Sequence, residues 1–265
     1  MQLRFVDLRA LVFGIAAALL VAGTAGAAEI KVMISGGLTA AYKALIPDYE
    51  RASGNTVVTA FGPSMGTTPN AIPVRLARGE PVDVLILVGY ALGDLIKEGK
   101  AVADSRVDLV RSPIGIAVRA GAPKPDISSV DALTRTLKAA KSVAYSDSAS
   151  GVYVSTELFS RLGIADEMKG KAKMIPATPV GEIVAQGGAE IGFQQISELM
   201  PVKGIDIVGP LPAEVQKITI FSAGISTTSK EPDAAKSLIE YLSSAQAAPV
   251  LTKAGLEPIQ GGGKP

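Results

Sequence analysis

The sequence contains no cysteine, no histidine and no tryptophan among its 265 residues. Without cysteine the chain can form no disulfide, offers no thiol nucleophile and has no thiol to carry a lipid anchor. Without histidine it lacks the usual general base of serine hydrolases, and the two absences together exclude most zinc and copper sites. Proton transfer must therefore rest on Asp, Glu, Lys or Tyr. We therefore expect no metal ion. We also expect no cofactor, because the sequence has neither a phosphate-binding loop nor a dinucleotide fingerprint.

An excess of charge of either sign is also missing. Lys and Arg number 26 and Asp and Glu 25, which leaves a net charge of +1. Proteins that bind nucleic acid usually carry a clear excess of basic residues, so we expect no nucleic-acid partner. What the chain does have is 48 % hydrophobic and 19 % charged residues, a composition typical of a globular protein.

The first residues have the pattern of a secretory signal peptide. Arg4 and Arg9 precede an apolar run over residues 10–22, and Ala25-Gly26-Ala27 fits a small-residue cleavage site. The alternative is a membrane anchor, but the apolar run is shorter than the ~20 residues that a span needs. We therefore expect cleavage near Ala27 and an exported, soluble product, which is periplasmic in a Gram-negative bacterium.

From residue 29 onward, short β-rich runs alternate with amphipathic helical patterns, which favours an α/β fold. The pattern starts afresh after residues 111–113, and a long β-rich run over residues 217–225 suits a return to the first unit. We predict two lobes, each a mostly parallel sheet flanked by helices, joined by hinge crossovers. Lobe 1 comprises residues 28–112 plus 218–265, and lobe 2 comprises residues 113–217.

Serine-bearing turns recur where predicted strands end and helices begin, at Ser35, at Ser64 and over residues 146–150. The ends of parallel strands line the crevice where ligands bind, and a helix N-terminus attracts an anion. A single serine in this place is often only an N-cap. The recurrence of the turn predicts a site for an oxyanion or a carboxylate.

The order of these elements resembles the bilobal periplasmic solute-binding proteins of ABC importers, and among them the molybdate-binding group. The resemblance rests on KVMISGGLTAA at residues 31–41, FGPSMG at 61–66, GEPVDV at 79–84 and SGVY at 150–153. It implies the type II binding-protein fold, a small anion in the cleft between the lobes, an ABC permease in the inner membrane as partner, and a monomer.

Two positions depart from the molybdate-binding pattern. Gly37 stands where that group has a ligand-contacting serine, and Gln195 stands where it has a ligand-binding tyrosine. Gln195 keeps a donor that suits a carboxylate. Arg75 and Asn70 could add a carboxylate clamp, although Arg75 also fits a solvated helix face.

Two functions from different classes remain open. In the first, the lobes close on an anion and deliver it to a permease, which requires only donors on both lobes and flexible crossovers near Ser112-Pro113 and Lys217-Ile218. The predicted ligand contacts are Ser35, Gly36, Gly37, Ser64, Met65, Ser148, Ser150, Gly151, Tyr153 and Gln195.

The second function is an enzyme in the same cleft. Some exported proteins that resemble the molybdate binders are aconitate isomerases, which move a double bond in a tricarboxylate by proton transfer. The candidate catalytic residues are then Tyr153, Arg75 and Asp147. As a base near neutrality, Tyr153 needs a pKa well below the usual ~10 of a phenol.

Overall fold

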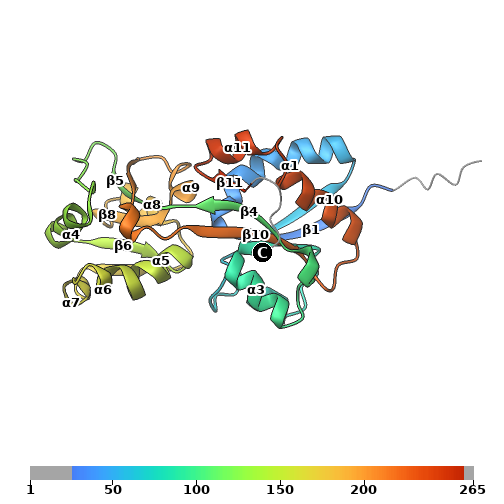
Figure 1. Cartoon of the computed structure of the whole chain (residues 1–265), viewed down its shortest axis with the longest axis horizontal. Helices are drawn as coiled ribbons and strands as arrows, with labels where there is room; N and C mark the ends of the chain where they lie inside the picture. The colour runs from blue at the N-terminus through green and yellow to red at the C-terminus, as the bar shows by residue number, and fades with distance from the viewer. Residues whose placement is uncertain (1–25, 260–265) are drawn as a thin grey trace, which may run out of the picture.

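The computed structural model describes residues 26–259, which form two lobes arranged end to end along the long axis of the molecule (Figure 1). The predicted signal peptide, residues 1–27, lies almost entirely outside the described residues. None of the helices within residues 26–259 is both long and apolar enough to cross a membrane.

Lobe 1 contains a six-stranded sheet in the order β11-β4-β10-β3-β1-β2. Parallel pairing joins β1 to β2 and β3, whereas β10 runs antiparallel to β3 and β4. The strands are β1 (Glu29–Ile34), β2 (Thr56–Phe61), β3 (Val84–Val88), β4 (Val107–Ser112), β10 (Thr219–Ile225) and β11 (Glu257–Pro258).

Lobe 2 contains a five-stranded sheet in the order β7-β6-β8-β5-β9. Here β6 is parallel to β7 and β8, and β5 is antiparallel to β8 and β9. The strands are β5 (Ile114–Arg119), β6 (Val143–Ser146), β7 (Ala172–Ile175), β8 (Ile191–Gln195) and β9 (Ile205–Pro210).

Both sheets are therefore mixed rather than mostly parallel, which corrects one part of the sequence prediction. The reason lies in the two crossovers. β5 and β10 enter their sheets at the boundary between the lobes, where β8 and β3 end, so Ile114 pairs with Gln195 and Phe221 pairs with Val88. A strand that starts where its neighbour ends must run in the opposite direction.

Helices cover the faces of both sheets (Figure 1). Apolar residues at helical spacing over residues 38–49 predict a helix, and the structure has a helix there that ends at Gly54, a left-handed C-cap with φ 76°. The sequence pattern also predicts a helix over residues 152–162; in the structure it begins three residues earlier and continues through a π-helical turn over residues 154–158. The helices are α1 (Thr39–Ser53), α2 (Ile72–Ala77), α3 (Gly89–Lys97), α4 (Val130–Ala139), α5 (Ala149–Tyr153), α6 (Phe159–Arg161), α7 (Ala165–Met168), α8 (Val180–Ala185), α9 (Ile196–Leu199), α10 (Pro232–Leu242) and α11 (Ala248–Lys253).

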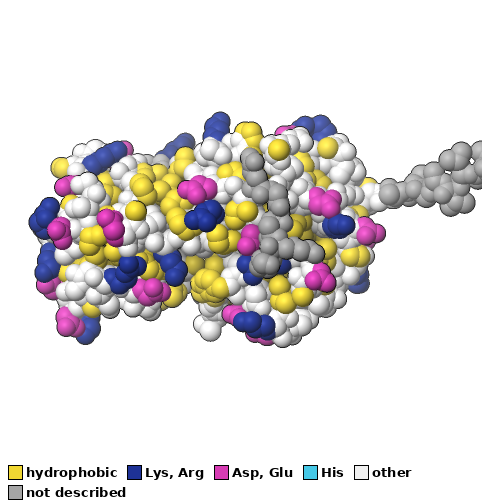
Figure 2. Space-filling model, viewed as in Figure 1, with side chains coloured by type: hydrophobic (Ala, Val, Ile, Leu, Met, Phe, Trp, Pro, Cys, Tyr) yellow, Lys and Arg dark blue, Asp and Glu magenta, His cyan; other side chains and the backbone are white. Residues whose placement is uncertain are grey.

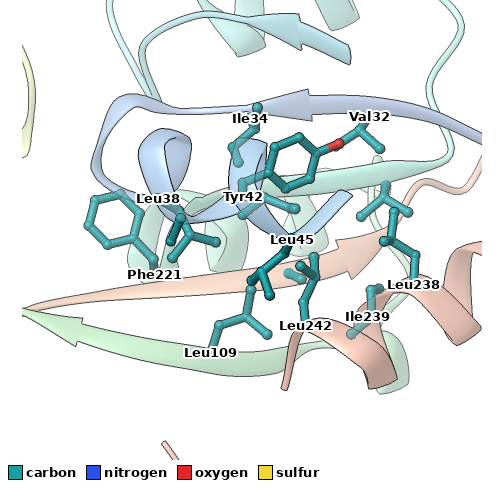
Figure 3. Packing of buried hydrophobic residues seen from close by; sticks show 14 of the residues in the cluster. Val32, Ile34, Leu38, Tyr42, Leu45, Leu109, Phe221, Leu238, Ile239 and Leu242 are labelled. Atoms are coloured by element: carbon teal, nitrogen blue, oxygen red, sulfur yellow. The ribbon is translucent and has the colours of Figure 1, made fainter. Parts of the chain in front are cut away.

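Each lobe has its own apolar core. In lobe 1, Ile34 of β1 packs with Tyr42 and Leu45 of α1, and with Leu238 and Leu242 of α10 (Figure 3). Lobe 2 has a separate cluster around its own sheet. The two clusters have no buried residue in common.

Asp83 fixes the entry to β3 and is the one charged residue in an otherwise apolar run. Its carboxylate accepts hydrogen bonds from the backbone N–H groups of Lys31 (2.8 Å) and Lys230 (2.9 Å) and from the hydroxyl of Ser229 (2.8 Å). Burial alone would raise the pKa of Asp83, but these hydrogen bonds lower it overall. The residue therefore ties β1 and the loop before α10 to β3.

Candidate functional site

A cavity of about 440 Å³ lies between the lobes, at the edges where β1, β2, β6 and β8 end. Six of the ten predicted contact residues line it, namely Ser35, Gly36, Gly37, Ser64, Ser148 and Gln195. The other four, Met65, Ser150, Gly151 and Tyr153, are not part of its wall. Of the proposed catalytic residues, Asp147 lines the cavity, whereas Arg75 and Tyr153 do not.

The first loop follows β1 and contributes an unused hydroxyl. The backbone N–H of Ser35 donates to the carbonyl of Ile86 at 2.9 Å, which holds the loop against β3. The Ser35 side chain is 3 % exposed, and its Oγ has no hydrogen-bond partner within residues 26–259. A buried hydroxyl without a partner is costly, so an oxygen atom of a ligand in the cavity is its natural acceptor.

The glycines of this loop are required by close packing. A Cβ atom at Gly37 would overlap the ring of Phe221, which comes from β10. This contact explains why a serine cannot stand at position 37, as it does in the molybdate-binding pattern. A Cβ atom at Gly36 would overlap Oε1 of Glu198, a residue of lobe 2.

The second loop follows β2 and presents Ser64. Its Oγ accepts a hydrogen bond from the backbone N–H of Val88 at 3.1 Å, which leaves the hydroxyl hydrogen free to donate. Met65 instead lies near the ring of Tyr90, with its sulfur 3.5 Å from the hydroxyl. Asn70 lines the cavity near Ser64.

Arg75 does not form the expected carboxylate clamp. Its Nε lies 3.0 Å from Oε2 of Glu80, so its charge is already paired at the surface of lobe 1. The cation in the cavity wall is instead Lys43 of α1, whose Nζ lies 4.6 Å from the ring centre of Phe61. Lys43 could not be recognised from the sequence, because it lies within an ordinary amphipathic helix.

The third loop follows β6 and carries three linked hydroxyls. Oγ of Ser146 lies 3.0 Å from the hydroxyls of both Ser148 and Ser150. Ser150 is fully buried, and a Cβ atom at Gly151 would overlap the carbonyl of Ser146. Ser150 and Gly151 therefore pack beneath the cavity and support Ser146 and Ser148 in its wall.

Asp147 lines the cavity and also holds the loop after β7. Its Oδ2 accepts a hydrogen bond from the backbone N–H of Ala177 at 3.1 Å. Ala177 has a φ of 55°, in the left-handed region that residues with a side chain seldom adopt. Strain of this kind is often found at ligand sites, and Ala177 and Thr178 both contribute to the wall.

Tyr153 faces the interior of lobe 2. Its hydroxyl donates to the carbonyl of Val215 at 2.6 Å and accepts from the guanidinium of Arg161 at 3.1 Å. Burial raises the pKa of Tyr153, and the nearby Arg161 only partly opposes this. The phenol is therefore neutral near pH 7 and engaged away from the cavity, so we do not retain it as a base or a ligand donor.

Gln195 connects the site to β4 and β10, the two strands of lobe 1 at which the chain crosses between the lobes (called the hinge strands below). In the amide orientation that satisfies both ends, its nitrogen donates to Oγ of Ser112 at 2.8 Å and its oxygen accepts from Oγ1 of Thr219 at 2.8 Å. Ser112 is the last residue of β4 and Thr219 the first of β10. The side chain is 1 % exposed, so its polar atoms serve the hinge more than the ligand.

Glu198 is a cavity residue that the sequence analysis did not identify. It lies on the short helix α9, is partly exposed, and reaches across the cavity to Gly36. Burial raises its pKa to about 7, and the neighbouring Asp147 also raises it, against the lowering effect of hydrogen bonds from the side chain of Gln194 and the backbone of Gln195. Nothing in the sequence around Glu198 marks it, because α9 is too short to show a period.

The charges of the site are few and mixed. Lys43, Asp147 and Glu198 are the titratable side chains in the wall, and the remaining polar groups are hydroxyls and amides. No three His, Cys, Asp or Glu side chains within residues 26–259 lie close enough together to hold a metal ion. On the face shown in Figure 2, basic and acidic side chains alternate over both lobes without a patch of one sign.

Comparisons with known proteins show the family to which the chain belongs. The family profile "Bacterial extracellular solute-binding protein" matches residues 30–257. An aconitate isomerase of Pseudomonas sp. is 51 % identical over 230 residues, which cover 87 % of this chain and 88 % of that protein. The molybdate-binding protein ModA of Azotobacter vinelandii is 27 % identical over 248 residues, which cover 89 % of this chain and 92 % of that protein.

Two solved structures show the same fold. The substrate-binding domain of a putative molybdenum ABC transporter from Clostridium difficile has a TM-score of 0.67 at 22 % identity, covering 88 % of this chain and all of that one. The periplasmic molybdate-binding protein of Azotobacter vinelandii has a TM-score of 0.69 at 19 % identity, and the match covers 87 % of this chain and 100 % of that one. The predicted bilobal α/β fold and the resemblance to molybdate-binding proteins are thereby confirmed.

Proposed function

The chain belongs to the family of bacterial extracellular solute-binding proteins. Within this family, we propose that it is an exported enzyme that interconverts trans- and cis-aconitate in the cavity between its lobes. The observation that carries the proposal is the 51 % identity to an aconitate isomerase over most of both chains. By contrast, the identity to a molybdate-binding protein is 27 %. The enzyme is proposed to act in the periplasm after removal of its signal peptide.

The size and donors of the cavity support a tricarboxylate as ligand. A volume of about 440 Å³ falls in the range of roughly 300–1,000 Å³ that is usual for small-molecule sites. It exceeds what a tetrahedral oxyanion fills. The hydroxyls of Ser35 and Ser64 can donate to carboxylate oxygens, and Lys43 supplies a positive charge.

The reaction is compatible with this chain's side chains. Moving the double bond of aconitate breaks one C–H bond at the methylene carbon and forms one at the former vinyl carbon. No electrons are gained or lost, so the step requires a group that takes and returns a proton and donors that hold the three carboxylates. The carboxyl groups in the wall are of the first type, and the serine hydroxyls are of the second.

A second candidate is capture of a small anion for an ABC importer, without turnover. The match to the molybdate-binding protein over 89 % of this chain favours it. In this role the two lobes close around the ligand and a permease receives it. Two departures from the molybdate pattern weigh against molybdate itself, because Gly37 has no hydroxyl and Gln195 is engaged with the hinge strands.

The test combines turnover with ligand preference. The purified protein is incubated with trans-aconitate in D₂O and followed by proton NMR, and its melting temperature is measured with molybdate, sulfate, citrate and both aconitates. The proposal predicts formation of cis-aconitate, and greater stabilisation by the aconitates than by molybdate. Stabilisation by molybdate alone, with no cis-aconitate formed, refutes the isomerase and supports capture for an importer.

A further inference from the structure

Three titratable side chains line the cavity, and they are not equivalent. Lys43 is exposed on α1 and lies over the ring of Phe61. One oxygen of Asp147 accepts a hydrogen bond from the backbone N–H of Ala177, so this carboxylate is held within lobe 2. Glu198 alone reaches from one lobe to the backbone of the other.

The position of Glu198 depends on a glycine in the opposite lobe. Its Oε1 lies so close to Gly36 that any side chain at position 36 would overlap it. Gly36 directly follows Ser35, whose buried hydroxyl has no partner within residues 26–259. A substrate carboxylate that accepts a hydrogen bond from Ser35 is therefore held beside the Glu198 carboxyl group.

We propose that Glu198 is the catalytic residue that removes and returns the proton during isomerisation, an inference that rests on the proposed function. An ionised oxygen of Glu198 takes a proton from the methylene carbon, and the electron pair of that C–H bond spreads over the allylic carbons and their carboxylates. The Glu198 carboxylic acid then gives the proton to the former vinyl carbon. The double bond has moved by one carbon, and Glu198 is ionised again.

One carboxyl group can serve both carbons, because both lie on the same face of a bound allylic system. The environment of Glu198 suits this double task. Burial and the neighbouring Asp147 raise its pKa. A group that takes up and releases a proton works best when its pKa lies near the pH of the reaction.

The test compares E198Q with the wild-type protein and with a matched control, E157Q. Gln keeps the shape of Glu198 but cannot carry the proton, whereas Glu157 is exposed on lobe 2 and away from the cavity wall. We expect the rate of cis-aconitate formation to fall by about 100-fold or more in E198Q, and to be unchanged in E157Q. Calorimetric titration should show that E198Q still binds trans-aconitate.

The outcomes separate this inference from the proposed function. If the wild-type protein forms no cis-aconitate, both are overturned. If it does and E198Q retains its rate, or if D147N loses the activity that E198Q retains, only the role of Glu198 is overturned. Loss of binding together with turnover in E198Q also contradicts the inference, because it indicates that Glu198 only holds the substrate. Partial recovery of the rate in E198D supports proton transfer by a carboxyl group.

Discussion

The contact between Gly36 and Glu198 allows a prediction that separates catalysis from folding. In G36A the new Cβ atom would overlap Oε1 of Glu198. Cβ atoms do not normally approach another heavy atom closer than 3.0 Å, so the carboxyl group must move away by about 1 Å or more. The atom that moves is the far end of a flexible side chain. We therefore expect a small loss of stability, below about 1 kcal/mol.

The effect on turnover should be much larger. A displacement of about 1 Å between reacting groups can reduce a rate by about 100-fold. The kcat for isomerisation of trans-aconitate, measured by NMR, should therefore fall by about this factor in G36A, while the melting temperature changes little. The prediction is specific to the loop, because Gly36 is the glycine whose missing side chain leaves room for Glu198.

Two other glycine substitutions serve as controls. At Gly37 the obstruction is the buried ring of Phe221, which cannot move aside, so G37A should lose about 1–3 kcal/mol of stability. At Gly170 no atom lies within 4 Å of an added Cβ, so G170A should change neither property. If G36A keeps the wild-type kcat, the position of Glu198 against the first loop is not needed for the reaction, and the reasoning fails.

Four other predictions follow from individual contacts. S35A should weaken binding of trans-aconitate by about 10-fold without lowering the melting temperature, because Oγ of Ser35 has no partner in the described part of the protein. Y153F should retain full turnover and lose about 1 kcal/mol of stability with its hydrogen bond to Val215, as measured in urea. The value of kcat/KM should rise with pH through the pKa of about 7 of Glu198 and then level, since the base must be ionised. D83N should lose about 2 kcal/mol at neutral pH, a difference that shrinks as the pH falls below the usual 3.8 of an aspartate, because the pKa of Asp83 is lowered by folding.

Much of the fold could be predicted because it depends on local patterns. The β-rich run over residues 56–61 predicts a strand and the amphipathic pattern over residues 130–139 predicts a helix, and the structure has both. The relative directions of neighbouring strands in the two sheets could not be predicted in the same way. β4 and β10 are the strands that connect the lobes, and their antiparallel pairing follows from where the chain crosses rather than from their composition.

Only some of the residues that line the cavity could be predicted from the sequence. The serine turns at Ser35, Ser64 and Ser148 could be found because strand ends and helix starts leave a local pattern, and all three line the cavity. Glu198 could not be found, because its importance comes from a contact with Gly36 across the two lobes. Tyr153 was assigned to the site from a motif, but α5 begins at Ala149 and turns the ring toward the core of lobe 2.

The central claim is that one cavity holds a tricarboxylate with Glu198 against the reacting carbons. A crystal structure of E198Q with trans-aconitate tests it most directly, because the substrate should persist in this variant. We expect aconitate in the cavity between the lobes, with carboxylates on the hydroxyls of Ser35 and Ser64 and the introduced amide at position 198 in contact with the methylene carbon. Aconitate bound elsewhere, or bound in the cavity with its methylene carbon facing away from position 198, would contradict the account.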